Sequence, residues 1–243
     1  MATPTTNPQY DLDAWAEQTE LGRRVFNYNY RMTGSEIRGW ELVNTVDMAS
    51  ESGLTERVYL WEKKGSEGRQ VIRIGITEAD EWRRAQADLQ NRLVFSMRRD
   101  IPGGKGGLAK LGDVRYAASL EDSETIASAY FVRGNLSISI ASVGEEPADV
   151  SAVARSLDRA FTAPPKQKDL EEKRAEDRSP QPRKVKKGER ALLKESLPEP
   201  VLRNGWLKVI VPDGEIAREG DDLVFRSPTA GTKRIQEFLV IQE

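Results

Sequence analysis

The chain contains neither cysteine nor histidine in its 243 residues. Its fold therefore cannot depend on a disulfide or on an ordinary zinc site, and apolar packing must hold it together. The same absence excludes Ser-His-Asp and Cys-His catalytic machinery, and it removes the usual thiolate and imidazole ligands of metals and haem. We therefore expect no cofactor and no metal site, and the sequence favours a binding protein over an enzyme.

Composition divides the chain into four segments. We expect a flexible leader over 1–9, an α+β domain over 10–162, a charged linker over 163–199 and a small all-β module over 200–243. The linker segment is rich in Lys, Arg, Glu, Asp and Pro, so it buries too little apolar surface to offset chain entropy. No run of the chain approaches the ~18 apolar residues that a membrane span needs.

The period of the apolar residues predicts the elements of the first domain. Ile72, Ile74 and Ile76 alternate with more polar residues, which is typical of a half-buried strand. Helices are predicted over 11–31, 77–97 and 147–161, and strands over 37–46, 57–63, 69–77, 113–118, 126–132 and 136–141. This order predicts an α+β fold: an antiparallel sheet with helices on one face, built from a pseudo-repeated α-β-β-β unit.

The C-terminal segment has its own strand pattern. Strands are predicted over 206–211, 215–218, 223–226 and 235–241, separated by turn residues. A module this short has a marginal core when no disulfide or metal supports it. We therefore expect it either to dock on the first domain or to meet a partner chain.

Three short motifs in the second half of the first domain resemble a known pattern. They are Leu111-Gly112-Asp113-Val114-Arg115-Tyr116, Tyr130-Phe131-Val132-Arg133-Gly134-Asn135-Leu136-Ser137-Ile138 and Val153-Ala154-Arg155-Ser156-Leu157-Asp158. This series resembles small bacterial extracytoplasmic α+β domains of lipoproteins and sensor ectodomains, which have a Gly-Asp before a Tyr-containing strand, an Arg-Gly-Asn hairpin and a closing helix. The resemblance implies an extracytoplasmic location, periplasmic or secreted, and a non-catalytic role. It assigns no functional residue.

A glycine-rich segment, Ile101 to Gly112, is the most unusual part of the sequence. Its glycines let backbone N–H groups approach an anion, and Lys105 and Lys110 would add charge. Phosphate-binding loops, however, run from a strand into a helix, whereas this segment runs from a helix into a strand. A connector is therefore the simpler interpretation, and an anion-binding lid is the alternative.

Aromatic and amide groups are concentrated at Phe26-Asn27-Tyr28-Asn29-Tyr30-Arg31, with Trp40 shortly after. Tyr28, Tyr30, Arg31 and Trp40 are candidate ligand-binding residues, because aromatic and amide groups suit sugar or peptide recognition. Core packing is the competing interpretation, since residues two apart lie on different faces of a helix.

Charged residues give weaker signals. Glu78, Asp80 and Glu81 are interpreted as helix-start residues, and Asp47 as an exposed strand end. Carboxylate pairs are the one catalytic device that this composition leaves open for glycoside hydrolysis. A basic cluster, Arg183-Lys184-Val185-Lys186-Lys187, lacks the interleaved aromatics that stack on nucleic acid bases.

These observations favour a non-catalytic extracytoplasmic protein for binding or assembly, with two modules joined by a charged tether. Its expected partner is another protein or a component of the cell envelope, with no specific nucleic acid and no membrane span. The first alternative is a carboxylate-dependent hydrolase acting on polysaccharide. A second alternative is a polyanion-binding protein, which the cluster Arg183–Lys187 would serve.

Overall fold

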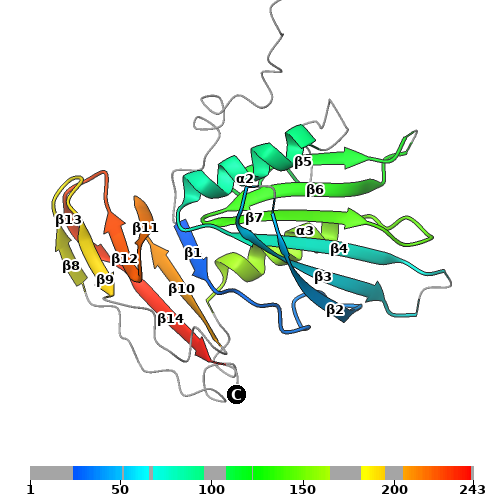
Figure 1. Ribbon diagram of the computed structural model, residues 1–243, viewed down its shortest axis with the longest axis horizontal. Coiled ribbons are helices and arrows are strands. Elements are labelled where there is room, and N and C mark those ends of the chain that lie inside the picture. The colour runs from blue at the N-terminus through cyan, green and yellow to red at the C-terminus, as the bar shows by residue number, and fades with distance from the viewer. Residues whose placement is uncertain are drawn as a thin grey trace, which may run out of the picture.

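Six antiparallel strands form the largest sheet of the computed structural model (Figure 1). The structure describes residues 24–50, 52–65, 68–95, 108–121, 123–164, 182–194 and 205–241. The strands are β2 (Trp40–Ala49), β3 (Thr55–Lys63), β4 (Val71–Glu78), β5 (Val114–Ser119), β6 (Ile126–Arg133) and β7 (Leu136–Ser142), in the order β2-β3-β4-β7-β6-β5. The prediction of an antiparallel sheet is confirmed, and the predicted strands match these bounds to within a few residues.

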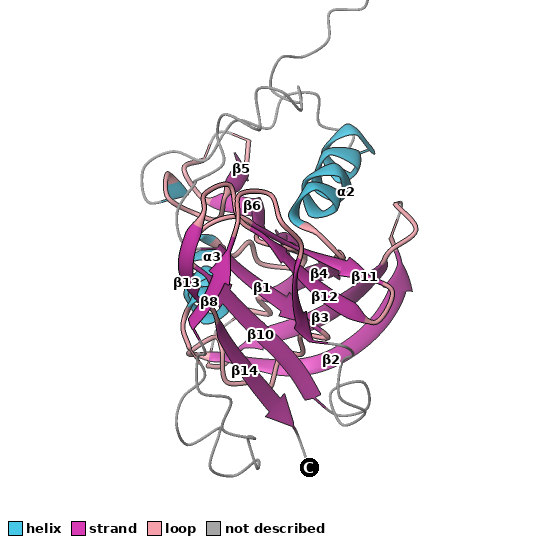
Figure 2. Cartoon of the chain, turned by 90° about the vertical axis from the view of Figure 1, so that its left-hand side faces the viewer, coloured by secondary structure: helices cyan, strands magenta, loops and turns pink. Residues whose placement is uncertain are grey.

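The two described helices pack on opposite faces of this sheet. Helix α3 (Ser151–Thr162) buries Leu157 and Phe161 in the core that contains Ile72, Ile74 and Ile76 of β4. Helix α2 (Trp82–Phe95) buries Ala85, Leu89 and Leu93 in a separate core with Val114, Tyr116 and Val132. Figure 2 shows one helix to either side of the sheet. The prediction that the helices lie on one face is therefore wrong, because β5 and β6 also present apolar residues, Tyr116 and Val132 among them, on the face that α2 covers.

The predicted pseudo-repeat is not found either. Three strands followed by a helix occur twice in chain order, but the two helices lie on opposite faces, so the halves are not equivalent. In place of the end of the predicted helix over 11–31, the structure has strand β1 (Arg24–Tyr28); residues 11–23 lie outside the described residues. No described helix has the length and apolarity to cross a bilayer.

Seven further strands form a second, smaller group, to the left in Figure 1. They are β8 (Pro182–Val185), β9 (Ala191–Lys194), β10 (Gly205–Val211), β11 (Glu215–Glu219), β12 (Asp222–Arg226), β13 (Gly231–Arg234) and β14 (Gln236–Ile241). They pair in the orders β1-β10-β14, β11-β12-β9 and β13-β8 around a shared core that includes Phe26, Leu207, Val209 and Phe225. Two of these strands, β8 and β9, lie inside the segment predicted as a solvated linker. There Val185 and Leu193 are buried, so this part of the prediction is wrong.

Strand β10 belongs to both cores. Its residues alternate, so that Leu207 and Val209 enter the core of the second group while Trp206 enters the core beneath α3. Lys208 is also buried, and its ammonium group donates to the carbonyl oxygens of Ala160 at 2.9 Å and Ala163 at 2.7 Å, at the C-terminus of α3. The two parts therefore share a strand, and the predicted arrangement of two modules on a tether is not observed.

The Arg133-Gly134-Asn135 turn is the second joint between the two parts. The Asn135 side chain accepts from the Asn27 backbone N–H at 2.7 Å and donates to the carbonyl oxygens of Asn27 at 2.5 Å and Ala79 at 3.0 Å. Gly134 has a φ of 58°, and a Cβ there would lie 1.7 Å from the carbonyl oxygen of Val25. The turn therefore serves to hold β1 against the large sheet, and only glycine allows this approach.

Lys208 gives the fold a dependence on pH. Burial lowers the pKa of its ammonium group from 10.5 to about 7. Between pH 7 and 10.5 the unfolded chain therefore binds more protons at this residue than the folded chain, so its contribution makes stability rise with pH. We expect Lys208→Met to reduce that rise by about 2–4 kcal/mol between pH 7 and 10 in urea unfolding. An equal pH dependence in Lys208→Met and wild type would contradict this assignment.

Candidate functional site

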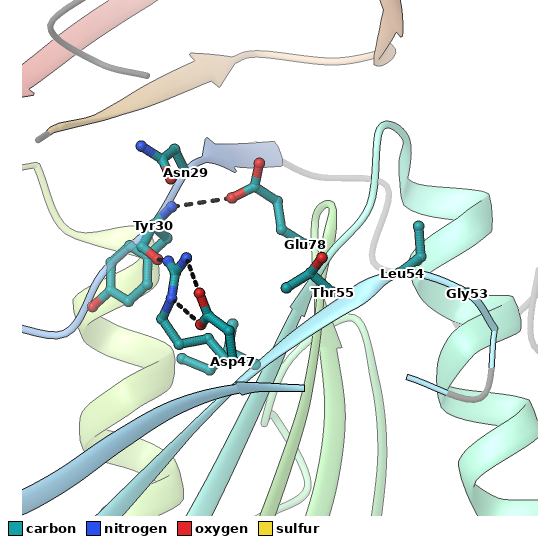
Figure 3. A pocket seen from close by; sticks show the side chains of 9 residues that line it. Asn29, Tyr30, Asp47, Gly53, Leu54, Thr55 and Glu78 are labelled. Carbon is teal, nitrogen blue, oxygen red and sulfur yellow. Dashed lines mark hydrogen bonds and ion pairs between the residues drawn. The ribbon is translucent and has the colours of Figure 1, made fainter. Parts of the chain in front are cut away.

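Two adjoining hollows lie where β2 and β3 meet the segment that follows β1. The larger is a cavity of about 540 Å³, lined by Asn29, Tyr30, Asp47, Gly53, Leu54, Thr55, Arg57, Ile76 and Glu78 (Figure 3). The smaller has a volume of about 320 Å³ and is lined by Arg31, Met32, Thr45, Asp47, Arg57 and Tyr59. Asp47 and Arg57 line both hollows, so they form one continuous site, which we call the β2 groove.

The segment after β1 forms one wall of the β2 groove. Asn29 has a φ of 56°, a left-handed conformation that asparagine tolerates better than most residues. Its side-chain amide donates to the carbonyl oxygen of Gly205 at 2.5 Å, which holds the bend against the start of β10. After this bend the backbone N–H of Tyr30 donates to Oε2 of Glu78 at 3.1 Å. Hydrogen bonds to β10 and to β4 therefore both hold this wall in place.

An ion pair occupies the middle of the groove. Asp47 and Arg57 face each other across the β2–β3 register. The guanidinium donates to Oδ1 of Asp47 from Nε at 2.7 Å and to Oδ2 from Nη2 at 3.3 Å. Its Nη1 donates to the carbonyl oxygen of Tyr30 at 2.9 Å. Arg57 therefore makes these hydrogen bonds within the protein, and the one to Tyr30 holds the segment after β1 over the sheet.

Glu78 lies at the end of β4, on the cavity side. Burial raises the pKa of its carboxyl group from 4.5 to about 7, against the opposing effect of N–H donors from Tyr30 and Asn29 and the charges of Arg218 and Arg57. A carboxyl group with a pKa near neutrality responds to any charge brought into the cavity.

The structure places the predicted ligand-binding residues in different surroundings. Tyr30 and Arg31 line the β2 groove, although the Tyr30 ring itself is buried edge-on against Phe161 and Trp206. Tyr28 is fully buried in the core of the second strand group, and Trp40 packs against the core beneath α3. Lys110 is exposed and lines neither hollow, while Lys105 lies outside the described residues.

Sequence reasoning missed the charged residues of the groove. Glu78 was interpreted as the start of a helix, but it ends β4, and Asp47 is paired with Arg57 rather than simply exposed. One signal was present: Glu78 continues the i, i+2 series of Ile74 and Ile76, so it places a carboxylate on the apolar face of the strand. No comparable signal exists for Asp47 and Arg57, whose pairing depends on the register between two strands.

The basic cluster contributes partly to structure. The Arg183 guanidinium donates to the backbone carbonyl oxygens of Leu192 and Leu193 in β9, which removes it from any anion site. Lys184, Lys186 and Lys187 are exposed. The geometry therefore gives no support to the polyanion-binding alternative.

Strand β2 forms the rim of the groove and the end of the large sheet. Within the described ranges it pairs with β3 alone, and its aliphatic side chains are unusually exposed: Val43 by 50%, Val46 by 47% and Met48 by 49%. Helix α2 packs on β4, β6 and β7, so β2 extends beyond the helical cover.

Comparison with protein-family models, with curated proteins and with solved structures finds no match. The proposals that follow therefore depend on the geometry of this chain.

Proposed function

We propose that this chain is a non-catalytic binding or assembly protein that receives an extended segment of a partner protein along β2. The observation that supports this proposal best is the exposed edge of β2. A sheet edge presents unpaired N–H and C=O groups, which pair readily with a further strand. The proposal keeps the predicted class of function and replaces the tethered modules by one binding edge.

The edge has few of the features that protect natural edge strands from pairing. Such strands are usually short, or they carry Lys or Pro. Strand β2 has ten residues, Trp40–Ala49, with neither Lys nor Pro and one irregularity between Leu42 and Asn44. Its two charged residues, Glu41 and Asp47, are each paired with a cation of the chain, Lys64 and Arg57. From Asn44 to Ala49 it pairs regularly with β3 and leaves its other side open to a partner, as far as the described residues show.

The two faces of β2 define the chemistry of the partner. Val46 and Met48 lie on the aliphatic face, beside Val58 of β3. Thr45 and Asp47 lie on the opposite face and line the β2 groove. Because side chains alternate along a strand, an added strand would place apolar residues beside Val46 and polar residues over the groove. The partner is therefore an extended segment with alternating apolar and polar side chains.

Charged substitutions on the edge should abolish this binding. We expect ten-residue peptides selected on the full chain from a random library to bind Val46→Lys/Met48→Lys at least tenfold more weakly than wild type, measured by fluorescence anisotropy. The reason is that two ammonium groups would replace the aliphatic contact surface of the incoming strand. Val94→Lys is the matched control, because Val94 is a 60% exposed aliphatic residue on α2. Equal binding to wild type and to the β2 variant would count against the proposal.

The hydrolase alternative has one observation in its favour, namely two carboxyl groups, Asp47 and Glu78, in one cavity. A glycosidase needs both groups free to reach its substrate. Here Arg57 holds both oxygens of Asp47, and Tyr30 donates to Glu78, so the geometry favours binding. Hydrolysis of a glycan by the wild type that is lost in Glu78→Gln would reverse this preference.

The extracytoplasmic location is part of the same proposal. It is supported by the motif resemblance in residues 111–158, while the absence of cysteine fits the cytosol and a bacterial exterior equally. Fractionation of the native host, with the protein detected by antibody, tests it: recovery in the cytoplasmic fraction alone would contradict it.

A further inference from the structure

Glu78, whose side chain is partly buried at the cavity, differs from the three buried carboxylates in its partners. An arginine lies within 3.2 Å of each of three others: Glu56 (Arg73 and Arg92), Asp88 (Arg92) and Asp113 (Arg133). Glu78 instead accepts a backbone N–H from Tyr30, and no ion pair joins it to a Lys or Arg side chain among the described residues. Arg218 and Arg57 act on Glu78 only from a distance, and desolvation still penalises its charge, so a cation bound in direct contact would stabilise the carboxylate.

The cavity around Glu78 fits a cation on an alkyl stem. Leu54 and Ile76 provide apolar wall, while Gly53 and Thr55 add little bulk. Such a wall suits the methylene groups of a long basic side chain, whose charged head needs a carboxylate at the end. An anionic ligand is disfavoured, because two carboxyl groups, Asp47 and Glu78, line the cavity and Arg57 already donates to Asp47 and Tyr30.

We propose that this cavity binds an organic cation, the guanidinium or ammonium head of an Arg or Lys side chain, with Glu78 as its carboxylate partner and Asp47 at the entrance. In Figure 3 Glu78, Tyr30 and Asp47 lie around one opening. Asp47 is half exposed even when paired with Arg57, which leaves its outer side accessible to an approaching cation. The source of the side chain depends on the proposed function: the partner segment that pairs with β2 carries it over the groove.

Proton release should accompany this binding. The charges of Arg57 in β3 and Arg218 in β11 act on Glu78, Glu78 in turn acts on Tyr28 of β1, and Asp47 of β2 lines the same cavity. Burial holds the pKa of Tyr28 well above 10, so its phenol stays neutral in the pH range of interest. A bound cation favours the carboxylate form of Glu78, whose pKa of about 7 must then fall. Affinity for the cation therefore rises between pH 6 and pH 8.

Two probes test the inference. One is methylguanidinium, and the other is the peptide acetyl-Thr-Val-Arg-Val-Thr-amide, whose citrulline analogue has the same shape without the charge. By isothermal titration calorimetry at pH 8, we expect Glu78→Gln to weaken the Arg peptide at least tenfold, and the citrulline peptide to bind the wild type at least tenfold more weakly. Glu62→Gln, an exposed carboxylate change on β3, is the control and should bind like the wild type.

A second measurement remains valid even if Glu78→Gln fails to fold. Titrations of the wild type at pH 7, in buffers of different ionisation enthalpy, should show release of about half a proton for each methylguanidinium bound. No proton release, or equal affinity for the Arg and citrulline peptides, would overturn the inference.

The inference and the proposed function fail separately. Methylguanidinium needs no strand pairing, so its binding should be unchanged in Val46→Lys/Met48→Lys. If methylguanidinium causes no proton release while Val46→Lys/Met48→Lys still weakens the binding of selected peptides, only the cation site is wrong. If methylguanidinium binds and no peptide needs β2, the cation site stands and only the proposed function is wrong.

Discussion

Replacing Asn135 with alanine is expected to lower the free energy of unfolding by about 3–5 kcal/mol, since the change leaves three buried backbone groups without partners. These groups are the N–H and carbonyl of Asn27 and the carbonyl of Ala79. The effect is large because one amide side chain connects β1, the end of β4 and the β6–β7 turn.

Urea unfolding followed by circular dichroism measures this effect. Asn44→Ala is the matched control, because Asn44 is exposed and its side chain contacts only the N–H of Thr45; we expect a change within about 0.5 kcal/mol. A loss below about 1 kcal/mol for Asn135→Ala would contradict the role of this turn as a joint.

Arg92→Met should have a comparably large effect, with a strong dependence on pH. Arg92 of α2 lies 2.7 Å from Oε1 of Glu56 and 2.9 Å from Oδ2 of Asp88, and it also contacts Thr77. Removing the guanidinium leaves buried Asp88 without its cation and leaves Glu56 with Arg73 alone, which costs about 3–5 kcal/mol at pH 7. Methionine keeps most of the apolar stem, so the change mainly reports the charge.

The pH dependence follows from Asp88. Despite the opposing effect of burial, Arg92 and the hydrogen bond from Ser52 hold its pKa below the usual 3.8. Its contribution to stability is therefore present above about pH 4 and is lost as pH falls through the folded-state pKa. The difference between wild type and Arg92→Met should accordingly shrink below pH 4. Arg84→Met, which breaks the exposed pair between Arg84 of α2 and Asp80 just before this helix, should cost less than about 0.5 kcal/mol at either pH.

The local pattern of apolar residues was enough to predict most strands of the large sheet and helix α3. The alternation Ile72, Ile74, Ile76 and the spacing Val153, Leu157, Phe161 each place one apolar face. Pattern was not enough for β1, where Phe26 and Tyr28 alternate over only a few residues. What makes that segment a strand is its pairing with β10, about 180 residues further along the chain, and this cannot be read from a local window.

Composition predicted a solvated linker over 163–199, where the structure has strands β8 and β9. Strands β8 and β9 bury few side chains, chiefly Val185 and Leu193, so their average polarity is that of a solvated chain. They are ordered by pairing with β13 and β12, which follow them in sequence. A helix over 77–97 was predicted from its apolar period, but which side of the sheet α2 covers depends on the connections, and those carry no periodic signal.

The β2 groove was predictable only in part. The aromatic and amide cluster correctly drew attention to Tyr30 and Arg31, although it is the backbone of Tyr30 that forms much of the wall. Asp47, Arg57 and Glu78 come together through strand register and through the path of the chain after β1. Neither of these is visible in the spacing of the residues.

Hydrogen exchange, measured amide by amide on the full chain with and without a selected peptide, tests the central claim most directly. If a partner strand pairs with β2, alternate amides between Asn44 and Ala49, those facing away from β3, should become at least tenfold more protected. Amides of β5, at the other end of the sheet, should not change. Protection elsewhere, with β2 unchanged in the saturated complex, would contradict binding along this edge.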